Sequence, residues 1–444
     1  MKRLEFFYDF VCPYAYLAST QVRALARAHG AELVYRPVLL GGIFNQLASG
    51  GAPYAPNQMH AAKARINELD LQRYAELYGA PLTRPAAHPR RTVLALRAAL
   101  ACAAQAPAPH SPATPALELA TDHGLARATH ALFEAYWRRG LDLEDPAVVS
   151  AALSGAGLDG PRAVAEAASH KQALIDCTQA AADAGVFGVP TFRVDGQLYW
   201  GQDRMDFVAR ALTDQPASAA DAAAPAHGDE YAGWPDPPPP SPRAPAGGQR
   251  VIEFWYDVSS PYAYLANARL ARLEGASGAR IELKPFLLGA LFKQLGTVDI
   301  PLLSFPAPKV RYLQQDLQRH ADHLGLPFRF PSGFPLRSIA PLRLAIASGD
   351  RQRQVATRLF QAFWEEDRDI SDLQVLTALA LELDLPKATL QAIESPEVKQ
   401  TLRENTEHAA KRGLCGAPSF VVGQELFWGQ DRMGLVARAA RGDA

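Results

Sequence analysis

The sequence predicts an α/β protein that contains two copies of one domain, each with a sheet that is split by a large helical insertion. Two observations predict the duplication. The phrase FYDFVCPYAYLA at 7–18 returns as WYDVSSPYAYLA at 255–266, and the hexapeptide WGQDRM occurs at 200–205 and again at 428–433. A repeat of this length is longer than a solenoid unit, so each copy is expected to fold around its own core.

Each copy begins with the order strand, helix, strand. A short β-branched and aromatic run, LEFFYDF at 4–10 or VIEFWYDV at 251–258, is typical of a buried strand. A proline then stands where a first helical residue is tolerated, Pro13 or Pro261, before a stretch with helical spacing. The next apolar run is AELVYRPVLL or ARIELKPFLL. This order predicts two parallel strands joined by a right-handed crossover.

The rest of each copy is helical in its middle and returns to strands near its end. The middle is rich in Ala and Leu with helical periodicity, whereas GVPTFRVDGQLYW and GAPSFVVGQELFW predict strands joined by a turn. An amphipathic helix is expected after WGQDRM. In the first copy, the Pro- and Ala-rich stretch at 104–116 has no counterpart in the second and predicts a surface loop.

A tract of Ala, Pro and Gly separates the two copies. It runs from 214 to 249 and cannot bury a core, so it predicts a flexible to semi-stiff linker. We therefore expect one domain at 1–213 and one at 250–444. The linker is long enough for the copies to dock on each other as an intramolecular pseudo-dimer, and a homodimer of whole chains is the alternative.

The composition excludes several classes of function. Lys and Arg number 45 against 46 Asp and Glu, so no global field favours a nucleic acid or an anionic membrane surface. The four cysteines are too few and too scattered for a disulfide scaffold or a zinc cage. Glu5 and Asp9 interrupt the apolar run of the N-terminus, and no run reaches the length of a membrane span. We expect a soluble, cytoplasmic protein with no metal site.

The junction of the first strand and the first helix is the expected reaction site, because a helix N-terminus favours an anion. Cys12 and Ser260 hold this position in the two copies. A thiol there is expected to have a depressed pKa, and a hydroxyl there can donate to a thiolate supplied by a ligand. The alternatives are a small apolar core residue for Cys12 and a helix N-cap for Ser260. A CxxC redox pair is absent, because Ala15 and Ala263 stand where the second thiol would lie.

Several separated motifs together resemble the 2-hydroxychromene-2-carboxylate isomerases and the related kappa-class glutathione transferases. They are DFVCPYAYLA and DVSSPYAYLA, the sequence GVFGVPTF and, above all, WGQDRM in both copies. The resemblance covers both copies nearly end to end. It implies two tandem thioredoxin-like domains, each with an inserted helical subdomain as in DsbA, and glutathione as the bound cofactor.

The resemblance also implies which residues bind glutathione. Ser260 matches the serine that contacts and activates the glutathione thiol in this family. Cys12 occupies the same position in the first copy and departs from the family pattern. Lys63 and Lys309 match a lysine directed toward the glycine carboxylate of glutathione, a role that suits a flexible ammonium group. Solvated lysines on a helix face are the alternative.

Two further loops of each copy complete the site that the resemblance implies. One is a cis-proline loop, whose residue before the proline presents its backbone to the ligand, and the other holds the γ-glutamyl group of glutathione. The alternatives are ordinary trans turn prolines and N-cap aspartates. The residues are Val189, Pro190, Gln202 and Asp203 in the first copy and Ala417, Pro418, Gln430 and Asp431 in the second.

The leading hypothesis is a glutathione-dependent isomerase or transferase that acts on a small electrophile, such as an aromatic-ring degradation intermediate. The family reaction adds the glutathione thiolate to an unsaturated carbonyl compound, allows rotation about the new single bond and eliminates the thiol, without a metal. A second hypothesis is a monothiol oxidoreductase of protein or glutathione disulfides that uses Cys12. A third is that one copy is a non-catalytic scaffold for the other.

Overall fold

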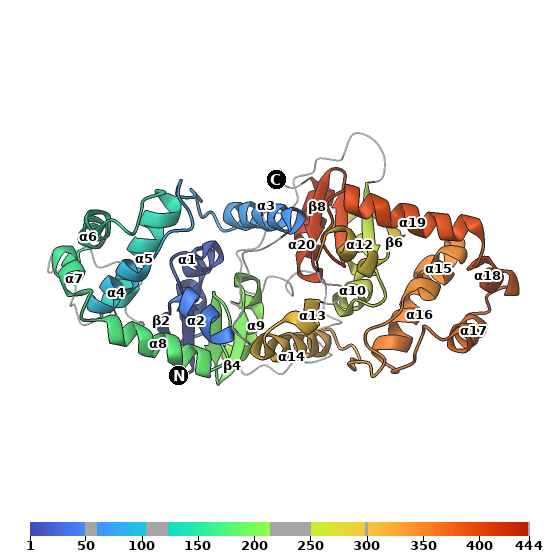
Figure 1. The fold of residues 1–444 in the computed structure, drawn as a ribbon, viewed down its shortest axis with the longest axis horizontal. Helices are drawn as coiled ribbons and strands as arrows, with labels where there is room; N and C mark the ends of the chain where they lie inside the picture. The colour runs from blue at the N-terminus through green and yellow to red at the C-terminus, as the bar shows by residue number, and fades with distance from the viewer. Residues whose placement is uncertain (49–59, 104–122, 214–249, 298–300, 443–444) are drawn as a thin grey trace.

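The computed structural model describes residues 1–48, 60–103, 123–213, 250–297 and 301–442. It contains two α/β domains arranged along the long axis of the molecule, each with a four-stranded sheet and helices around it (Figure 1). The predicted α/β architecture with a helical insertion in each copy is confirmed. The predicted surface loop at 104–116 and the predicted linker at 214–249 lie outside the described residues.

The sheet of the first domain has the strand order β2-β1-β3-β4. Strand β1 runs parallel to β2, with Leu4 opposite Leu33, as the strand, helix, strand order predicted, and antiparallel to β3. It is buried from Leu4 to Tyr8, which explains its apolar and aromatic residues, and the one charged residue among them, Glu5, pairs with Arg36 and Arg193. The strands are β1 (Arg3–Tyr8), β2 (Glu32–Pro37), β3 (Thr191–Val194) and β4 (Gln197–Trp200).

The sheet of the second domain repeats this topology in the order β6-β5-β7-β8. Strand β5 runs parallel to β6, with Ile252 opposite Ile281, and antiparallel to β7. The duplication that the repeated motifs predicted is therefore a duplication of the whole sheet. The strands are β5 (Val251–Tyr256), β6 (Arg280–Pro285), β7 (Ser419–Val422) and β8 (Glu425–Trp428).

The helices of the first domain fall into three groups. Helix α1 joins β1 to β2, α2 and α3 follow β2, and α4 to α8 form the helical insertion at the outer end of the molecule (Figure 1). A last helix, α9, is present where it was predicted and begins at the last residue of the WGQDRM motif. The helices are α1 (Pro13–Ala28), α2 (Leu40–Leu47), α3 (Ala61–Leu77), α4 (Val93–Ala101), α5 (His123–Phe133), the π-helical turn η2 (Glu134–Arg138), α6 (Pro146–Gly155), α7 (Gly160–Glu166), α8 (Lys171–Asp183), the 3-10 turn η3 (Gln202–Arg204) and α9 (Met205–Thr213).

The helices of the second domain follow the same plan. Within the described ranges, no helix of either domain combines the length and the apolar character that crossing a bilayer requires. The helices are α10 (Pro261–Asn267), α11 (Leu270–Ser277), α12 (Leu288–Gln294), α13 (Pro301–Ser304), α14 (Ala307–His323), α15 (Ile339–Ala347), the 3-10 turn η5 (Gly349–Arg351), α16 (Gln352–Trp364), α17 (Leu373–Glu382), α18 (Lys387–Ala392), α19 (Pro396–Lys411), the 3-10 turn η6 (Gln430–Arg432) and α20 (Met433–Arg441).

One helix of the second copy differs from the prediction. The spacing after Pro261 predicts one continuous helix, but the structure has α10 and α11 with a break between them at Ala268 and Arg269. At the break, the Arg269 side chain donates to the backbone carbonyl of Gln430. Gln21 stands at the aligned position of the first copy, where α1 is continuous. The break therefore occurs where the second copy has an arginine that contacts Gln430 and the first copy has a glutamine in its place.

Two tryptophans hold the helical insertions against the sheets. Trp137 and Trp364 end the repeated phrases FEAYW and FQAFW, and both side chains are fully buried. The Trp137 indole donates to the Phe10 carbonyl oxygen at 2.8 Å, and the Trp364 indole donates to the Val258 carbonyl oxygen at 2.9 Å. Each insertion is thereby fixed to the loop between the first strand and the first helix.

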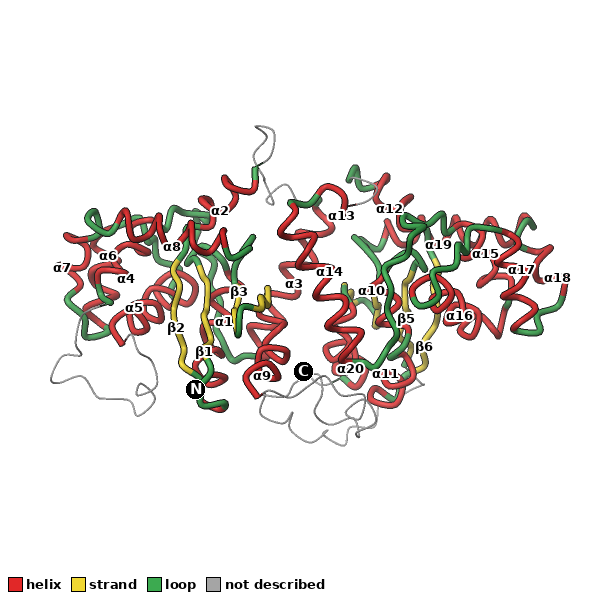
Figure 2. The backbone as a smooth tube through the Cα atoms, turned by 90° about the horizontal axis from the view of Figure 1, so that it is seen from below, coloured by secondary structure: helices red, strands yellow, loops and turns green. Residues whose placement is uncertain are grey.

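The two domains dock on each other through α3 and α14, which lie between the sheets (Figure 2). Arg73 on α3 donates to the Leu426 carbonyl oxygen on β8 at 2.9 Å. Arg319 on α14 donates to the Leu198 carbonyl oxygen on β4 at 3.3 Å. Each domain therefore packs a long helix on the edge strand of the other, and the copies form a pseudo-symmetric pair within one chain.

Trp364→Phe is expected to destabilise the second domain. The substitution removes the indole N–H, so the buried Val258 carbonyl oxygen loses its donor, and it leaves a void beside the smaller ring. The free energy of unfolding should fall by about 2–4 kcal/mol in urea denaturation followed by circular dichroism. Leu381→Ala, at a side chain that is 66% exposed, is the control and should change it by less than about 0.5 kcal/mol. Equal stability of the two variants would contradict this role of Trp364.

Candidate functional site

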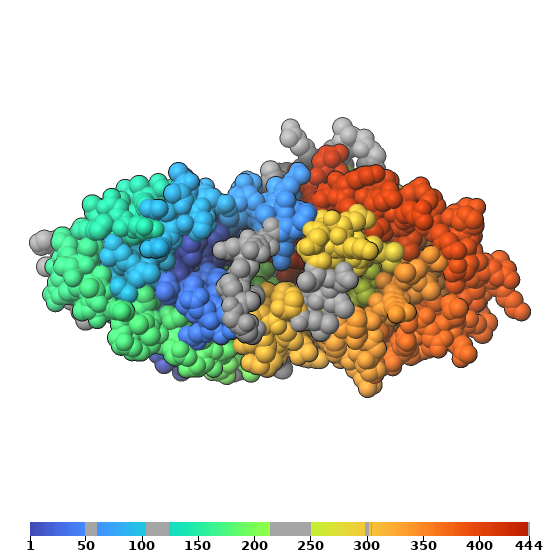
Figure 3. Space-filling view, viewed as in Figure 1, coloured from blue at the N-terminus to red at the C-terminus, as the bar shows by residue number. Residues whose placement is uncertain are grey.

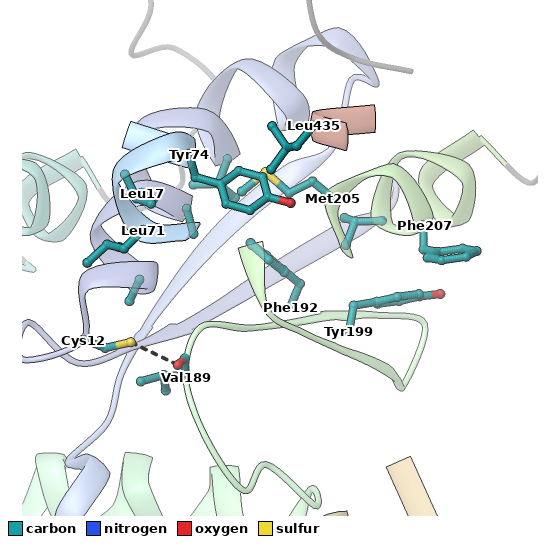
Figure 4. Packing of buried hydrophobic residues seen from close by; sticks show 14 of the residues in the cluster. Cys12, Leu17, Leu71, Tyr74, Val189, Phe192, Tyr199, Met205, Phe207 and Leu435 are labelled. Atoms are coloured by element: carbon teal, nitrogen blue, oxygen red, sulfur yellow. Dashed lines mark hydrogen bonds between the residues drawn. The ribbon is translucent and has the colours of Figure 1, made fainter. Parts of the chain in front are cut away.

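The predicted reaction site of the first copy lies where β1 ends and α1 begins. Cys12 is the N-cap residue of α1, and its thiol donates a hydrogen bond to the carbonyl oxygen of Val189 at 3.2 Å (Figure 4). The Val189–Pro190 peptide bond is cis, as predicted. The fold therefore joins the helix start to the cis-proline loop across a sequence separation of 177 residues.

Ser260 makes the corresponding contact in the second copy. Its hydroxyl donates to the carbonyl oxygen of Ala417 at 2.9 Å and accepts the backbone N–H of Ala263 at 3.2 Å. The Ala417–Pro418 peptide bond is also cis. Ser260 is thus a helix N-cap, which was the alternative role, and at the same time a donor directed at the cis-proline loop.

The prediction that Cys12 has a depressed pKa is wrong. Burial raises the pKa of Cys12 to about 12, although the backbone N–H groups of Ala15 and Tyr14 favour the thiolate. The nearby Asp9 carboxyl group also opposes ionisation. At this helix start, the loss of hydration outweighs the stabilisation that the backbone supplies, so Cys12 is a thiol at neutral pH.

A buried carboxyl group lies behind each helix start and was missed by the sequence analysis. Asp9 accepts the backbone N–H of Leu40 at 2.9 Å and the hydroxyl of Thr92 at 2.5 Å. Asp257 repeats both contacts in the second copy, with the hydroxyl of Ser338 as a donor at 3.0 Å. Each carboxyl group joins the loop of the reaction site to two later helices. The available signal was that both copies keep an aspartate three residues before the helix start.

Cys12 should react slowly with iodoacetamide in the folded chain. Because a thiol with a pKa near 12 ionises only in strong alkali, the alkylation rate should still rise about tenfold per pH unit between roughly pH 7 and pH 10. Mass spectrometry of the Cys12 peptide measures this rate. The unfolded chain is the control, and its rate should level off above about pH 8.5. The same plateau in the folded chain would contradict the raised pKa.

Glycine permits the close turn of the loop that contains Gln202 and Asp203. Gly201 has a φ angle of 109°, and a Cβ at this position would lie 2.4 Å from Asp203 Oδ1. Gly429, with a φ angle of 115°, has the same relation to Asp431. The glycine of the WGQDRM motif therefore allows the aspartate side chain to fold back over the start of its own loop.

Arginines of the opposite copy bind the two loop aspartates. Asp203 accepts a hydrogen bond from Arg432 at 2.8 Å, and Asp431 accepts one from Arg204 at 2.9 Å. Burial alone would raise the pKa of Asp431, but Arg432 and Arg204 hold this pKa below its usual range. The loop aspartates are therefore members of ion pairs rather than the helix N-caps that were the alternative.

The same two arginines also bind aspartates on the long helices. Arg204 donates to Asp316 of α14 at 3.1 Å, and Arg432 donates to Asp70 of α3 at 2.8 Å. Each arginine thus contacts three carboxylates, two of which belong to the opposite copy. These two arginines, the four aspartates that they bind and one further arginine on each long helix form a cluster that we call the interdomain ion network. Its members are Arg73, Arg204, Arg319, Arg432, Asp70, Asp203, Asp316 and Asp431.

The two loop glutamines are both buried but have different surroundings. Gln430 accepts a hydrogen bond from Arg269 and lies with its amide nitrogen 3.2 Å from a ring nitrogen of His320. Gln202 is 3% exposed, and its amide nitrogen Nε2 makes no hydrogen bond to any described residue. A buried donor without an acceptor is costly, so this nitrogen is available to donate to an acceptor on a bound ligand.

Lys63 and Lys309 lie where the copies meet and not on a solvated helix face. The Lys63 ammonium is 5.4 Å from the ring centroid of Trp428, and the Lys309 ammonium is 5.4 Å from that of Trp200. Each tryptophan belongs to the copy opposite the lysine. Burial and then the Lys63 charge lower the pKa of Lys309 to about 8.

The site residues that the sequence predicted thus form two groups. The helix start and the cis-proline loop meet within each copy, whereas the loop aspartates and the lysines meet residues of the other copy. The sequence analysis did not predict these contacts between the two copies. Its only signal was that KARINELDLQR and KVRYLQQDLQR keep the same lysine, aspartate and arginine at the same spacing.

Arg432→Ala should strongly destabilise the docked pair of domains. The substitution leaves the carboxylates of Asp70 and Asp203 without the guanidinium that both of them bind. We expect the free energy of unfolding by urea to fall by about 3–5 kcal/mol. The Arg432→Lys variant should recover only part of this loss, because an ammonium group cannot bind several carboxylates in the planar geometry of a guanidinium group. Arg65→Ala, on the exposed side of α3, is the control. A loss as small as that of Arg65→Ala would contradict the role of the network.

Comparisons with known proteins agree with this arrangement of two similar units. A family model described as a DSBA-like thioredoxin domain matches residues 3–213 and again 251–441. Human glutathione S-transferase kappa 1 is 29% identical over 205 residues, which cover 42% of this chain and 89% of the relative. The 2-hydroxychromene-2-carboxylate isomerase of Sphingobium xenophagum is 30% identical over 196 residues, which cover 41% of this chain and 94% of the relative. A solved structure of a 2-hydroxychromene-2-carboxylate isomerase matches with a TM-score of 0.40 and 26% identity, over 43% of this chain and 93% of that chain.

Proposed function

The chain belongs to the DsbA-like thioredoxin domain family, together with the kappa-class glutathione transferases and the 2-hydroxychromene-2-carboxylate isomerases, and from this premise we propose that it is a glutathione-dependent isomerase. The proposed reaction is cis-trans isomerisation of an unsaturated carbonyl compound, with glutathione transferase activity as a related outcome. The observation that carries the proposal is the Ser260 hydroxyl, which stands at a helix start and is directed at a cis-proline loop.

Ser260 would hold and polarise the reacting sulfur. When bound, glutathione would supply the thiolate that adds to the substrate and later leaves it, so that the intervening single bond can rotate. The Ser260 hydroxyl would exchange the Ala417 carbonyl oxygen for this sulfur as its acceptor. The N–H groups and the dipole of the first turn of α10 would favour the same negative charge. Ala263 stands where a second redox thiol would be needed, which supports isomerisation over dithiol oxidation.

The remaining predicted residues would bind the peptide part of glutathione. The backbone of Val189 or Ala417, before the cis-proline, is the proposed contact of the cysteinyl part. Gln202 with Asp203, or Gln430 with Asp431, would bind the γ-glutamyl end, since an amide donor suits its carboxylate and an aspartate suits its ammonium. The γ-glutamyl end carries one ammonium and one carboxylate group. Its binding would therefore leave the net charge around the interdomain ion network unchanged.

The two copies would contribute unequally to turnover. Burial raises the pKa of Cys12 to about 12, so the hypothesis of a monothiol oxidoreductase, which requires a Cys12 thiolate, loses its main support. We propose that the second copy, with Ser260, is the main catalyst, and that the first copy binds glutathione and supports its twin. The substrate is proposed to be a small aromatic electrophile that binds under the helical insertion.

The cysteines support a reducing compartment. Cys12, Cys102, Cys177 and Cys415 are free thiols, and disulfides are uncommon where thiols are kept reduced. We therefore propose a cytoplasmic location for the protein.

Ser260→Ala should remove most of the isomerase activity. Loss of one polarising donor is expected to lower kcat by about 100-fold in an assay of unsaturated ketones with glutathione, and the ultraviolet absorbance of bound thiolate should disappear. Cys12→Ala should retain most of the activity of the chain. Ser260→Cys, which places the residue of the first copy in the second, tests whether a thiol can replace the hydroxyl.

Two results would contradict the proposal. The first is the absence of saturable glutathione binding by calorimetry to the full chain. The second is an unchanged rate in Ser260→Ala. Loss of the N-cap costs only about 1 kcal/mol, so circular dichroism should show that this variant remains folded and that a lost rate reflects the lost hydroxyl.

A further inference from the structure

We propose that Arg269 is a positioning residue of the second copy: it sets the orientation of the Gln430 amide before a ligand binds and thereby strengthens the binding of glutathione to this copy. This inference rests on the proposed function and adds a determinant of affinity that the first copy lacks. It follows from the contacts of Gln430, from the helix break at Arg269 and from the different surroundings of Gln202.

Arg269 holds both the backbone and the side chain of Gln430. Its Nη2 donates to the backbone carbonyl oxygen of Gln430 and also to the side-chain oxygen Oε1. Gln430 is 1% exposed, so these two oxygens depend on donors from the protein. Because a guanidinium group only donates, the oxygen of the amide must face Arg269 and the nitrogen must face away from it.

His320 fixes the other end of the same amide. A ring nitrogen of His320 lies 3.2 Å from Nε2 of Gln430. Burial lowers the pKa of His320 to about 3, so the ring is neutral at neutral pH and keeps one nitrogen that can accept a hydrogen bond. One N–H of the Gln430 amide is thereby directed at His320, and the second N–H remains for a carboxylate of the ligand.

The break between α10 and α11 places Arg269 at this loop. The backbone N–H of Arg269 donates to the Ala266 carbonyl oxygen at 3.0 Å rather than to that of Leu265, which is the acceptor in a continuous helix. The side-chain Nε of Arg269 donates to the Leu265 carbonyl oxygen at 3.4 Å instead. The guanidinium group is thus anchored at the end of α10, with Nη2 directed at the Gln430 loop.

The first copy has different side chains at both positions. Gln21 stands at the position of Arg269, within the continuous helix α1. Tyr74 stands at the position of His320, and a phenol ring offers no imidazole nitrogen as an acceptor. The amide nitrogen of Gln202 makes no hydrogen bond to any residue that the structure describes. The orientation of the Gln202 amide is therefore not set in the way that the Gln430 amide is.

Space for a ligand lies where the two copies meet. Figure 3 shows a hollow on one face of the molecule, beside α3 in blue and the gold segment of α13 and α14. A cavity of about 80 Å³ between the copies is lined by both loop glutamines, by Arg269 and by His320. Since one water needs about 10–15 Å³ of such a cavity, the carboxylate of a γ-glutamyl group has room beside the amides.

An amide that is oriented in advance should bind its ligand more tightly. Ordering one side chain with several rotatable bonds during binding weakens the affinity by about 2- to 10-fold. In the second copy, Arg269 and His320 order Gln430 during folding, so glutathione does not have to order it. Removal of Arg269 should therefore weaken binding by a factor within this range.

The test measures the second copy alone. In a full chain with Cys12→Ala, the thiolate absorbance of bound glutathione depends on Ser260, and its titration gives the Kd of the second copy. Arg269→Gln, which places the residue of the first copy in the second, should raise this Kd about fivefold. The kcat at saturating glutathione should change by less than about twofold, because Ser260 is untouched. Arg280→Gln, at an exposed arginine on β6, is the control and should leave the Kd unchanged.

Cysteinylglycine separates positioning from folding. This dipeptide keeps the thiol and the glycine of glutathione but lacks the γ-glutamyl group, so Arg269→Gln should change its Kd by less than about twofold. Equal weakening of both ligands would show that Arg269 is structural and would overturn the inference. An unchanged Kd for glutathione in Arg269→Gln would also overturn it, while the proposed function would stand. Absence of the thiolate signal in the unsubstituted chain would overturn both.

Discussion

The exchange of Arg204 and Arg432 between the two copies is the interaction on which the rest of the site depends. Each arginine directly follows the aspartate of its own loop, yet two of the three carboxylates that it contacts belong to the other copy. A buried guanidinium has lost its hydration and must be matched by carboxylates, and this network supplies four arginines and four aspartates. The ion pairs that join each loop to a long helix therefore form only when the copies are docked, because their two partners belong to different copies.

A second constraint is the contact between the helix start and the cis-proline loop. In one copy a thiol makes it and in the other a hydroxyl, and both donate to the carbonyl oxygen before the proline. The geometry is the same, but the chemistry differs, because Cys12 is itself ionisable and burial raises its pKa to about 12. Ser260 needs no ionisation to act as a donor. The duplicated fold thus has a hydroxyl donor at the helix start of one copy and a buried thiol in the same place in the other.

Much of the fold was predictable because it depends on local patterns. The apolar runs around Phe6 and Phe254 and the prolines that follow them indicated the parallel strand pairs. The resemblance located the cis-proline loops at Pro190 and Pro418, and both peptide bonds are cis. The pKa of Cys12 was not predictable in this way, because it is a balance between the backbone donors of a helix start and the loss of hydration, and burial depends on segments far away in the sequence.

The sequence by itself determined that the protein is a duplicated α/β unit and which residues stand at each helix start, because strand and helix periodicity and exact repeats are local properties of the chain. Only the tertiary structure decided which of the two copies each charged side chain contacts. Lys63, Asp70 and Arg73 have the same spacing whether α3 faces its own sheet or the other one, so the sequence cannot distinguish the two cases. Only the docking of α3 on β8 turns these side chains toward Trp428, Arg432 and Leu426, because desolvated charges must meet partners wherever the helix packs.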